Sequence, residues 1–142
     1  MAPTSGSFGN FWIRYHSPIG QEFMPTIGNL TKVDVYIEES HLTGASGGGQ
    51  LTINIKRDGI TGLIVTSHTQ QVQPGFKGWL SFDVPDVSLI PGSLYVIQLV
   101  EYEGSNLLWY ESEGDLYPRG RAIFQGQPMA NRDWWFRTWD LP

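Results

Sequence analysis

Apolar residues recur at every second position over several short stretches of this chain. In the segment 32–38, Val33, Val35 and Ile37 alternate with more polar residues, and this period of two predicts a half-buried strand. The pattern recurs at 51–56 and 79–84. Further short strands are expected at 8–15, 21–24, 62–66, 93–100, 107–111, 121–125 and 134–139. Because 93–100 is apolar on both faces, it is expected to be a central strand.

Turn residues separate these stretches, and no segment has the apolar period of a helix. The 142 residues include 17 glycines and 9 prolines, a composition that favours turns over long helices. About eight to ten strands at this spacing predict an all-β fold, a two-sheet antiparallel β-sandwich of the jelly-roll-like kind. The length matches a single module spanning residues 1–142.

Charge and composition exclude several classes of partner. The chain has 9 basic residues against 14 acidic ones, a net charge of −5, and no dense basic run. Because nucleic-acid binding depends on attraction to phosphates, we expect no nucleic-acid partner. No apolar run approaches the ~18 residues of a membrane span, and residues 1–7 lack the features of a signal peptide. Membrane insertion is therefore not expected.

Several segments together resemble a known kind of module. They are 21–26, 28–37, 78–82, 91–95, 117–122 and 133–138. Their strand and turn patterns resemble β-sandwich modules of bacterial secreted and cell-surface proteins, similar to jelly-roll carbohydrate-binding modules. The resemblance implies a lectin-like, carbohydrate-binding sandwich at an extracellular or cell-surface location, as part of a larger multimodular protein. The pair Trp134-Trp135 departs from it, since one large and one small apolar residue would be usual there.

The terminal strand 134–139 separates its aromatic residues by parity. Trp134 and Phe136 fall on one face, while Trp135, Arg137 and Trp139 fall on the other. Phe136 assigns the first face to the core. We therefore expect the second face to be an exposed ladder on which sugar rings stack, with the guanidinium beside the indoles. The alternative is a purely structural ladder beneath the edge of a sheet.

A loop over residues 111–121 mixes hydrogen-bonding groups of both signs. Asp115, Tyr117, Arg119 and Arg121 are candidate ligand contacts, because loops on rigid strands often carry recognition. The alternative is a solvated loop in which its acids pair with its arginines at little net gain.

The aromatic pair Trp109-Tyr110 precedes this loop. Alternation makes one ring core and the other outward, and we expect Trp109 to be the outward ring. The expected ligand-binding set is therefore Trp109, Asp115, Tyr117, Arg119, Arg121, Trp135, Arg137 and Trp139. The chain is expected to be a non-catalytic carbohydrate-binding module. A structural or protein-interaction module of a surface protein is the alternative, and a small glycan-cleaving enzyme is a third reading.

Motifs for catalysis and metal binding are missing from the sequence. No nucleophile elbow, phosphate-binding glycine loop or His-Glu-x-x-His motif occurs, and there is no cysteine. His16, His41 and His68 are too scattered for a Zn²⁺ site. No required cofactor is expected. The resemblance leaves room for a structural calcium ion, but no ligand set stands out among the acidic residues.

Overall fold

A computed structural model describes residues 8–26, 28–42, 44–45, 47–113 and 117–139. Within these ranges the chain forms twelve strands and one 3-10 turn, Arg14–His16, and no α-helix. This confirms the all-β prediction. The strand number exceeds the expected eight to ten because the terminal segment divides into two strands and a short hairpin precedes it.

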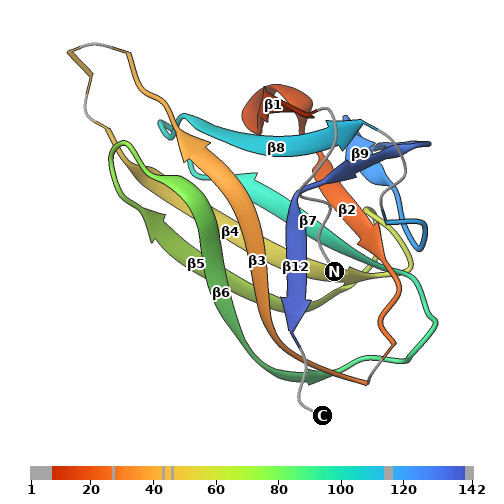
Figure 1. Ribbon diagram of the computed structural model, residues 1–142. Coiled ribbons are helices and arrows are strands. Elements are labelled where there is room, and N and C mark those ends of the chain that lie inside the picture. Colours follow the sequence, from red (N-terminus) through yellow and green to blue (C-terminus); the bar gives the residue numbers. More distant parts are fainter. Residues whose placement is uncertain (1–7, 27, 43, 46, 114–116, 140–142) are drawn as a thin grey trace.

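The strands form two antiparallel six-stranded sheets packed as a sandwich (Figure 1). The first sheet contains β1 (Phe8–Trp12), β3 (Asn29–Glu39), β6 (Lys77–Ser88), β8 (Leu107–Glu113), β11 (Arg132–Trp134) and β12 (Phe136–Trp139). The second contains β2 (Ile19–Phe23), β4 (Gly49–Arg57), β5 (Ile64–Val72), β7 (Tyr95–Glu101), β9 (Ala122–Phe124) and β10 (Gln127–Met129). The chain passes repeatedly from one sheet to the other, as the jelly-roll-like prediction requires.

The hydrophobic core lies between the two sheets. From the first sheet, Val33, Val35 and Ile37 are fully buried, as their alternation predicts. From the second, β7 lies between β2 and β4, which confirms the expected central strand. Trp134 and Phe136 are buried in the core as well, at 0% and 1% exposure.

The register of β3 explains how the terminal segment reaches the outer face of the first sheet. One edge of β3 pairs with β8 over Ile37–Glu39 and with β12 over Lys32–Val35. The opposite edge pairs with β6 along almost the whole strand. Figure 1 shows β12 beside β3 in the front layer. Side chains of β12, β3 and β6 therefore share one outward surface.

One strand extends well beyond its expected range. β5 runs over Ile64–Val72, whereas apolar content predicts a strand only at 62–66. Its second half is rich in polar residues, and it lies at the edge of the second sheet next to β4. An edge strand keeps one face in water, so its hydrogen-bonded ladder forms without an apolar pattern.

Candidate functional site

The outer surface of the first sheet carries a group of aromatic rings at its centre. Tyr36 of β3 pairs in register with Trp79 of β6, and its N–H donates to the carbonyl of Trp135 at 3.2 Å. The three side chains therefore form one row across the sheet. The Tyr36 ring meets both indoles edge-on, with centroids 5.3 Å from Trp79 and 5.0 Å from Trp135. Edge-to-face packing of this kind fixes the orientation of all three rings.

The next row along β3 combines a buried carboxylate with a guanidinium. Arg137 pairs in register with Asp34, and its Nη2 lies 3.2 Å from Oδ2 of Asp34. The guanidinium lies 3.9 Å from the centroid of the Trp79 ring, which is close cation–π stacking. Asp34 is only 1% exposed, whereas the Arg137 side chain is 35% exposed. The Arg137 side chain thus joins the aromatic row to a buried negative charge.

Trp139 occupies the third row and is the most exposed of these rings, at 45%. Its Nε1–H donates to Oδ2 of Asp34 at 2.9 Å, and Nζ of Lys32 lies 4.5 Å from its ring centroid. Oδ1 of Asp34 and Nε of Arg137 are buried and have no hydrogen-bond partner among the described residues. Because native structures rarely leave buried polar atoms unpaired, this pair of atoms calls for a physical explanation.

Tyr110 borders the aromatic row on the side of β8. Its ring lies 5.0 Å from Tyr36 and 5.6 Å from Trp135, and its hydroxyl donates to Oε1 of Glu38 at 2.6 Å. Burial raises the pKa of Tyr110, and the hydrogen bond to Glu38 raises it further. We call the whole set the aromatic face. It comprises Tyr36, Trp79, Tyr110, Trp135, Arg137 and Trp139.

The structure places the predicted terminal ladder as expected from its parity. Trp135, Arg137 and Trp139 lie on the outer surface, opposite the core residues Trp134 and Phe136. Trp135 does not stand free, because its Nε1–H donates to Oγ of the buried Ser112 at 2.7 Å. The ladder therefore has both a structural anchor at Trp135 and an exposed end at Trp139.

The prediction that Trp109 faces outward is wrong. Trp109 is 0% exposed and stacks on Trp134 with centroids 4.8 Å apart and an interplanar angle of 12°. Its register partner is the core residue Ile37, and its Nε1–H donates to the carbonyl of Trp135. The pairing of β8 with β3 thus directs Trp109 inward and leaves the outward parity to Tyr110.

The predicted loop candidates do not join the aromatic face. The Tyr117 ring packs edge-on against Phe136 of the core at 5.1 Å, and its hydroxyl bonds to the backbone of Met24. This geometry does not present the Tyr117 ring as a stacking platform. Arg119 and Arg121 line a separate pocket, and Asp115 lies outside the described residues.

Glu111 and Arg121 do not form ion pairs within this loop, as the alternative had it, but pair with residues elsewhere. Glu111 is buried and pairs with Arg132, with Nη2 to Oε1 at 2.7 Å. Arg121 pairs instead with Glu22 of β2, at 2.8 Å. Sequence spacing cannot find either pair, because in each one the two partners lie far apart in the sequence.

The sequence prediction missed three members of the aromatic face, namely Tyr36, Trp79 and Tyr110. Tyr36 alternates with the buried valines of β3, and Trp79 alternates with Leu80 and Phe82 of β6. Both therefore carry the outward parity in the sequence. What the sequence lacks is the register that brings them beside Trp135.

The described acidic residues include one partly buried carboxylate with a raised pKa, that of Glu101. No group of three or more His, Asp or Glu side chains within the described ranges is arranged to hold a metal ion. Burial raises the pKa of Glu101, but its two oxygens accept the backbone N–H groups of Arg14 and Leu107. That carboxylate is therefore a structural tie between loops. Glu103, two positions further along the chain, is exposed.

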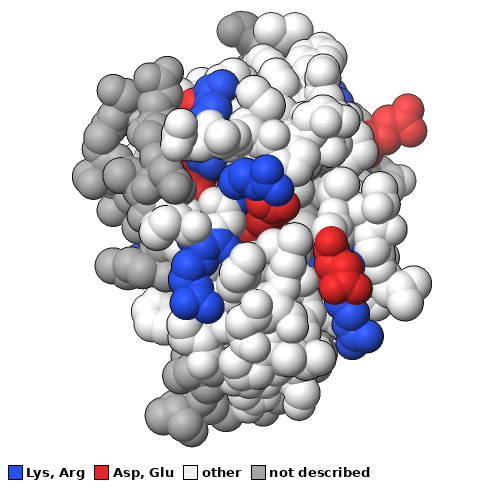
Figure 2. All heavy atoms as spheres, turned by 90° about the vertical axis from the view of Figure 1, so that its right-hand side faces the viewer, with Lys and Arg blue, Asp and Glu red and all other residues white. Residues whose placement is uncertain are grey.

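Charged side chains do not form a field of one sign on the face in Figure 2. Basic and acidic groups lie side by side there, separated by wide uncharged areas. Within the described residues, no helix has the length and apolar character needed to cross a bilayer.

No family model and no curated protein matches the sequence. Two solved structures align with the chain at low identity. A carbohydrate-binding module from Clostridium stercorarium, in complex with cellobiose, is 10% identical over 99% of this chain and 100% of that chain, with a TM-score of 0.43. An arabinose-bound α-L-arabinofuranosidase is 12% identical over 84% of this chain, with a TM-score of 0.36, and the alignment spans only 18% of that enzyme. Both similarities are too distant to assign a function to this chain.

Proposed function

We propose that this chain is a non-catalytic carbohydrate-binding module and that the aromatic face is its binding surface. The observation that carries the proposal is the position of Trp139 beside Asp34 and Arg137. An exposed indole offers a flat surface to the C–H groups of a sugar ring. A carboxylate and a guanidinium next to it offer an acceptor and donors to the hydroxyl groups at the rim.

The unpaired atoms support the polar half of this proposal. Oδ1 of Asp34 accepts no hydrogen bond and Nε of Arg137 donates none to a described residue. The Arg137 side chain is 35% exposed, so a rotation of its guanidinium would open both atoms to an incoming hydroxyl group. A ligand that pairs with them would remove the cost of leaving them unsatisfied.

The length of the surface supports an oligosaccharide rather than a single sugar. Trp135 and Trp139 are four positions apart on nearly extended chain, a separation of about 13 Å along the strand direction. The rings are held rigidly at one end by Tyr36 and Ser112. A rigid platform loses little conformational entropy when a ligand binds. The extracellular or cell-surface location and the larger multimodular protein remain part of the proposal, supported by the sequence resemblance.

Affinity electrophoresis against soluble cellulose, xylan, mannan and laminarin tests the proposal. Trp139→Ala is the test variant, because Trp139 is exposed and the fold does not depend on its burial. Tyr15→Ala and Tyr102→Ala are matched controls, since both rings are exposed elsewhere, at 61% and 67%. We expect one polysaccharide to retard the wild-type chain and both controls but not Trp139→Ala. Retardation lost in either control would place the site elsewhere, and no retardation by any polysaccharide would contradict the proposal.

The competing proposal is a structural or protein-interaction module that uses the same exposed indole against a protein. It predicts association of the chain through this face, because exposed apolar patches on isolated domains promote self-association. Light scattering coupled to size exclusion separates the two. A monomer that binds a polysaccharide supports the first proposal, and a dimer that Trp139→Ala dissociates supports the second.

A further inference from the structure

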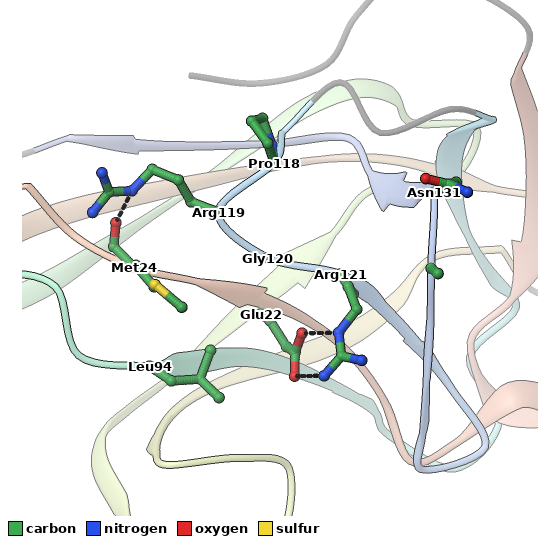
Figure 3. Close-up of a pocket in the computed structure, with 9 residues that line it drawn as sticks. Glu22, Met24, Leu94, Pro118, Arg119, Gly120, Arg121 and Asn131 are labelled. Carbon is green, nitrogen blue, oxygen red and sulfur yellow. Dashed lines mark hydrogen bonds and ion pairs between the residues drawn. The ribbon is translucent and has the colours of Figure 1, made fainter.

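A separate pocket lies beside β2 of the second sheet, whereas the aromatic face lies on the first sheet. It has a volume of about 310 Å³, and its lining includes Glu22, Met24, Leu94, Arg119, Arg121 and Asn131. Figure 3 shows Arg119 and Arg121 on either side of Gly120, above Met24, Glu22 and Leu94. The pocket is at the lower end of the size range of small-molecule sites, with room for one small ring.

The two arginines are held in place by the close approach of Gly120 to β2. A Cβ atom at Gly120 would lie 1.9 Å from the carbonyl oxygen of Glu22, so no larger residue fits without moving the backbone. The N–H of Glu22 donates to the carbonyl of Arg121 at 2.9 Å, which fixes the segment against β2. A backbone docked this closely fixes the positions from which the Arg119 and Arg121 side chains extend to the pocket.

The charges of the pocket leave one cation in excess. Arg121 is paired with Glu22 through two hydrogen bonds, Nε to Oε1 at 2.8 Å and Nη2 to Oε2 at 3.2 Å (Figure 3). Arg119 donates Nε to the carbonyl of Met24 at 3.3 Å and also interacts with the side chain of Tyr117, but it forms no ion pair with an acidic side chain among the described residues. Among the described residues, the lining contains no further ionisable group. One negative charge would therefore balance the pocket in a chain whose net charge is −5.

We propose that this pocket is a second binding site, which takes the carboxylate of an acidic sugar such as a uronic acid. The two terminal nitrogens of Arg119 can donate to the two oxygens of a carboxylate, whereas Arg121 holds Glu22 through Nε and Nη2. Met24 and Leu94 offer apolar surface to the C–H groups of a sugar ring, and the Asn131 amide offers a donor and an acceptor to its hydroxyls. A single excess positive charge suits a monoanion better than a doubly charged phosphate.

Titration of the full chain with glucuronate, glucose and inorganic sulfate tests this proposal by NMR. We expect glucuronate to shift the amide signals of Gly120 and Asn131 and to bind more tightly than glucose or sulfate. Arg119→Gln should weaken glucuronate binding by about tenfold, since a charge-assisted hydrogen bond is lost. The matched control is Arg57→Gln, which removes the same charge from an exposed position outside the pocket.

Each other outcome overturns the proposal. Equal binding of glucose would mean that the pocket does not read the carboxylate, and equal binding of sulfate would mean that it holds any small anion. An equal effect of Arg57→Gln would mean attraction to the overall charge rather than a site. Trp139→Ala should leave glucuronate binding unchanged. The titration therefore distinguishes a failure of the pocket proposal from a failure of the aromatic face as a polysaccharide-binding surface.

Discussion

Oδ2 of Asp34 accepts a hydrogen bond from the Nε1–H of Trp139 at 2.9 Å and also forms an ion pair with Arg137, whose Nη2 lies 3.2 Å away. A carboxylate that is only 1% exposed thus organises the most exposed end of the aromatic face. The function of the surface and the stability of β3 are coupled at this residue.

Asp34→Asn tests that coupling. The amide keeps the size of the carboxylate but removes its charge, so the hydrogen bond from Trp139 weakens and Arg137 loses its ion-pair partner. We expect the free energy of unfolding to fall by about 1.5–3 kcal/mol, which is the range for hydrogen bonds to charged groups. Urea denaturation measures it. Ser81→Ala is the control. Ser81 is the register partner of Asp34 on β6, and its substitution should change the free energy of unfolding little. An Asp34→Asn variant as stable as the wild type would contradict the coupling.

The two populations of tryptophan predict opposite effects of truncation. Trp134 is fully buried and stacks on Trp109, so Trp134→Ala should cost about 3–5 kcal/mol of stability through the cavity it leaves. Trp139→Ala, at a ring that is 45% exposed, should cost far less and leave a cooperative unfolding transition. Thermal and urea unfolding of both variants check this. Equal losses would mean that Trp139 is part of the core.

The alternation of side chains along a strand predicts which residues share a face, but not which face is buried. It correctly separated Trp134 and Phe136 from Trp135, because an extended strand alternates its side chains regardless of tertiary context. For Trp109 and Tyr110 it left two solutions. The choice between them depends on the pairing of Trp109 with Ile37, which is a long-range register that no local pattern contains.

The loop candidates illustrate a second limit of sequence reasoning. Tyr117 looks like an exposed aromatic residue in a polar loop, yet its N–H donates to Oδ2 of Asp133 at 2.9 Å, a residue that is 0% exposed. Asp133 also accepts from Nε2 of Gln21, so a buried polar network ties the segment to β2. Such a network forms between residues 112 positions apart and leaves no signature in either segment alone.

Gly120→Ala tests the docking of the Arg119–Arg121 segment. The added methyl group meets the backbone of Glu22, so the segment must move away from β2. We expect a loss of about 1–3 kcal/mol, typical of overpacking, together with altered amide shifts at Glu22. Gly9→Ala is the control, because a Cβ there makes only ordinary contacts, the nearest at 3.5 Å. A Gly120→Ala chain with native stability and unchanged spectra would contradict the close approach.

A buried carboxylate at the loop end predicts a pH dependence of stability. Burial alone would raise the pKa of Glu39, but the hydrogen bonds from Gly75 and His41 outweigh it, and the pKa is lowered overall. A lowered folded-state pKa contributes stability that is present above the unfolded value, about 4.3, and is lost as the pH falls through the folded-state pKa.

Glu39→Gln should therefore be less stable than the wild type at pH 7, and the difference should shrink as the pH falls below about 4. Urea denaturation between pH 3 and 7 measures both curves. Glu103→Gln, at an exposed carboxylate, should follow the wild type throughout. A stability difference for Glu39→Gln that grows toward low pH would contradict the sign of the shift.

The indole N–H signals of the six tryptophans give the most direct test of the aromatic face as a sugar-binding surface. Each signal can be followed separately in a ¹H–¹⁵N NMR titration. The ligand is an oligosaccharide fragment of the polysaccharide that retards the chain in affinity electrophoresis. If the aromatic face is the binding surface, we expect the signals of Trp79, Trp135 and Trp139 to shift with a common binding curve. Those of the buried Trp109 and Trp134 should stay in place. A saturating ligand that leaves the Trp139 signal unmoved would contradict the central claim.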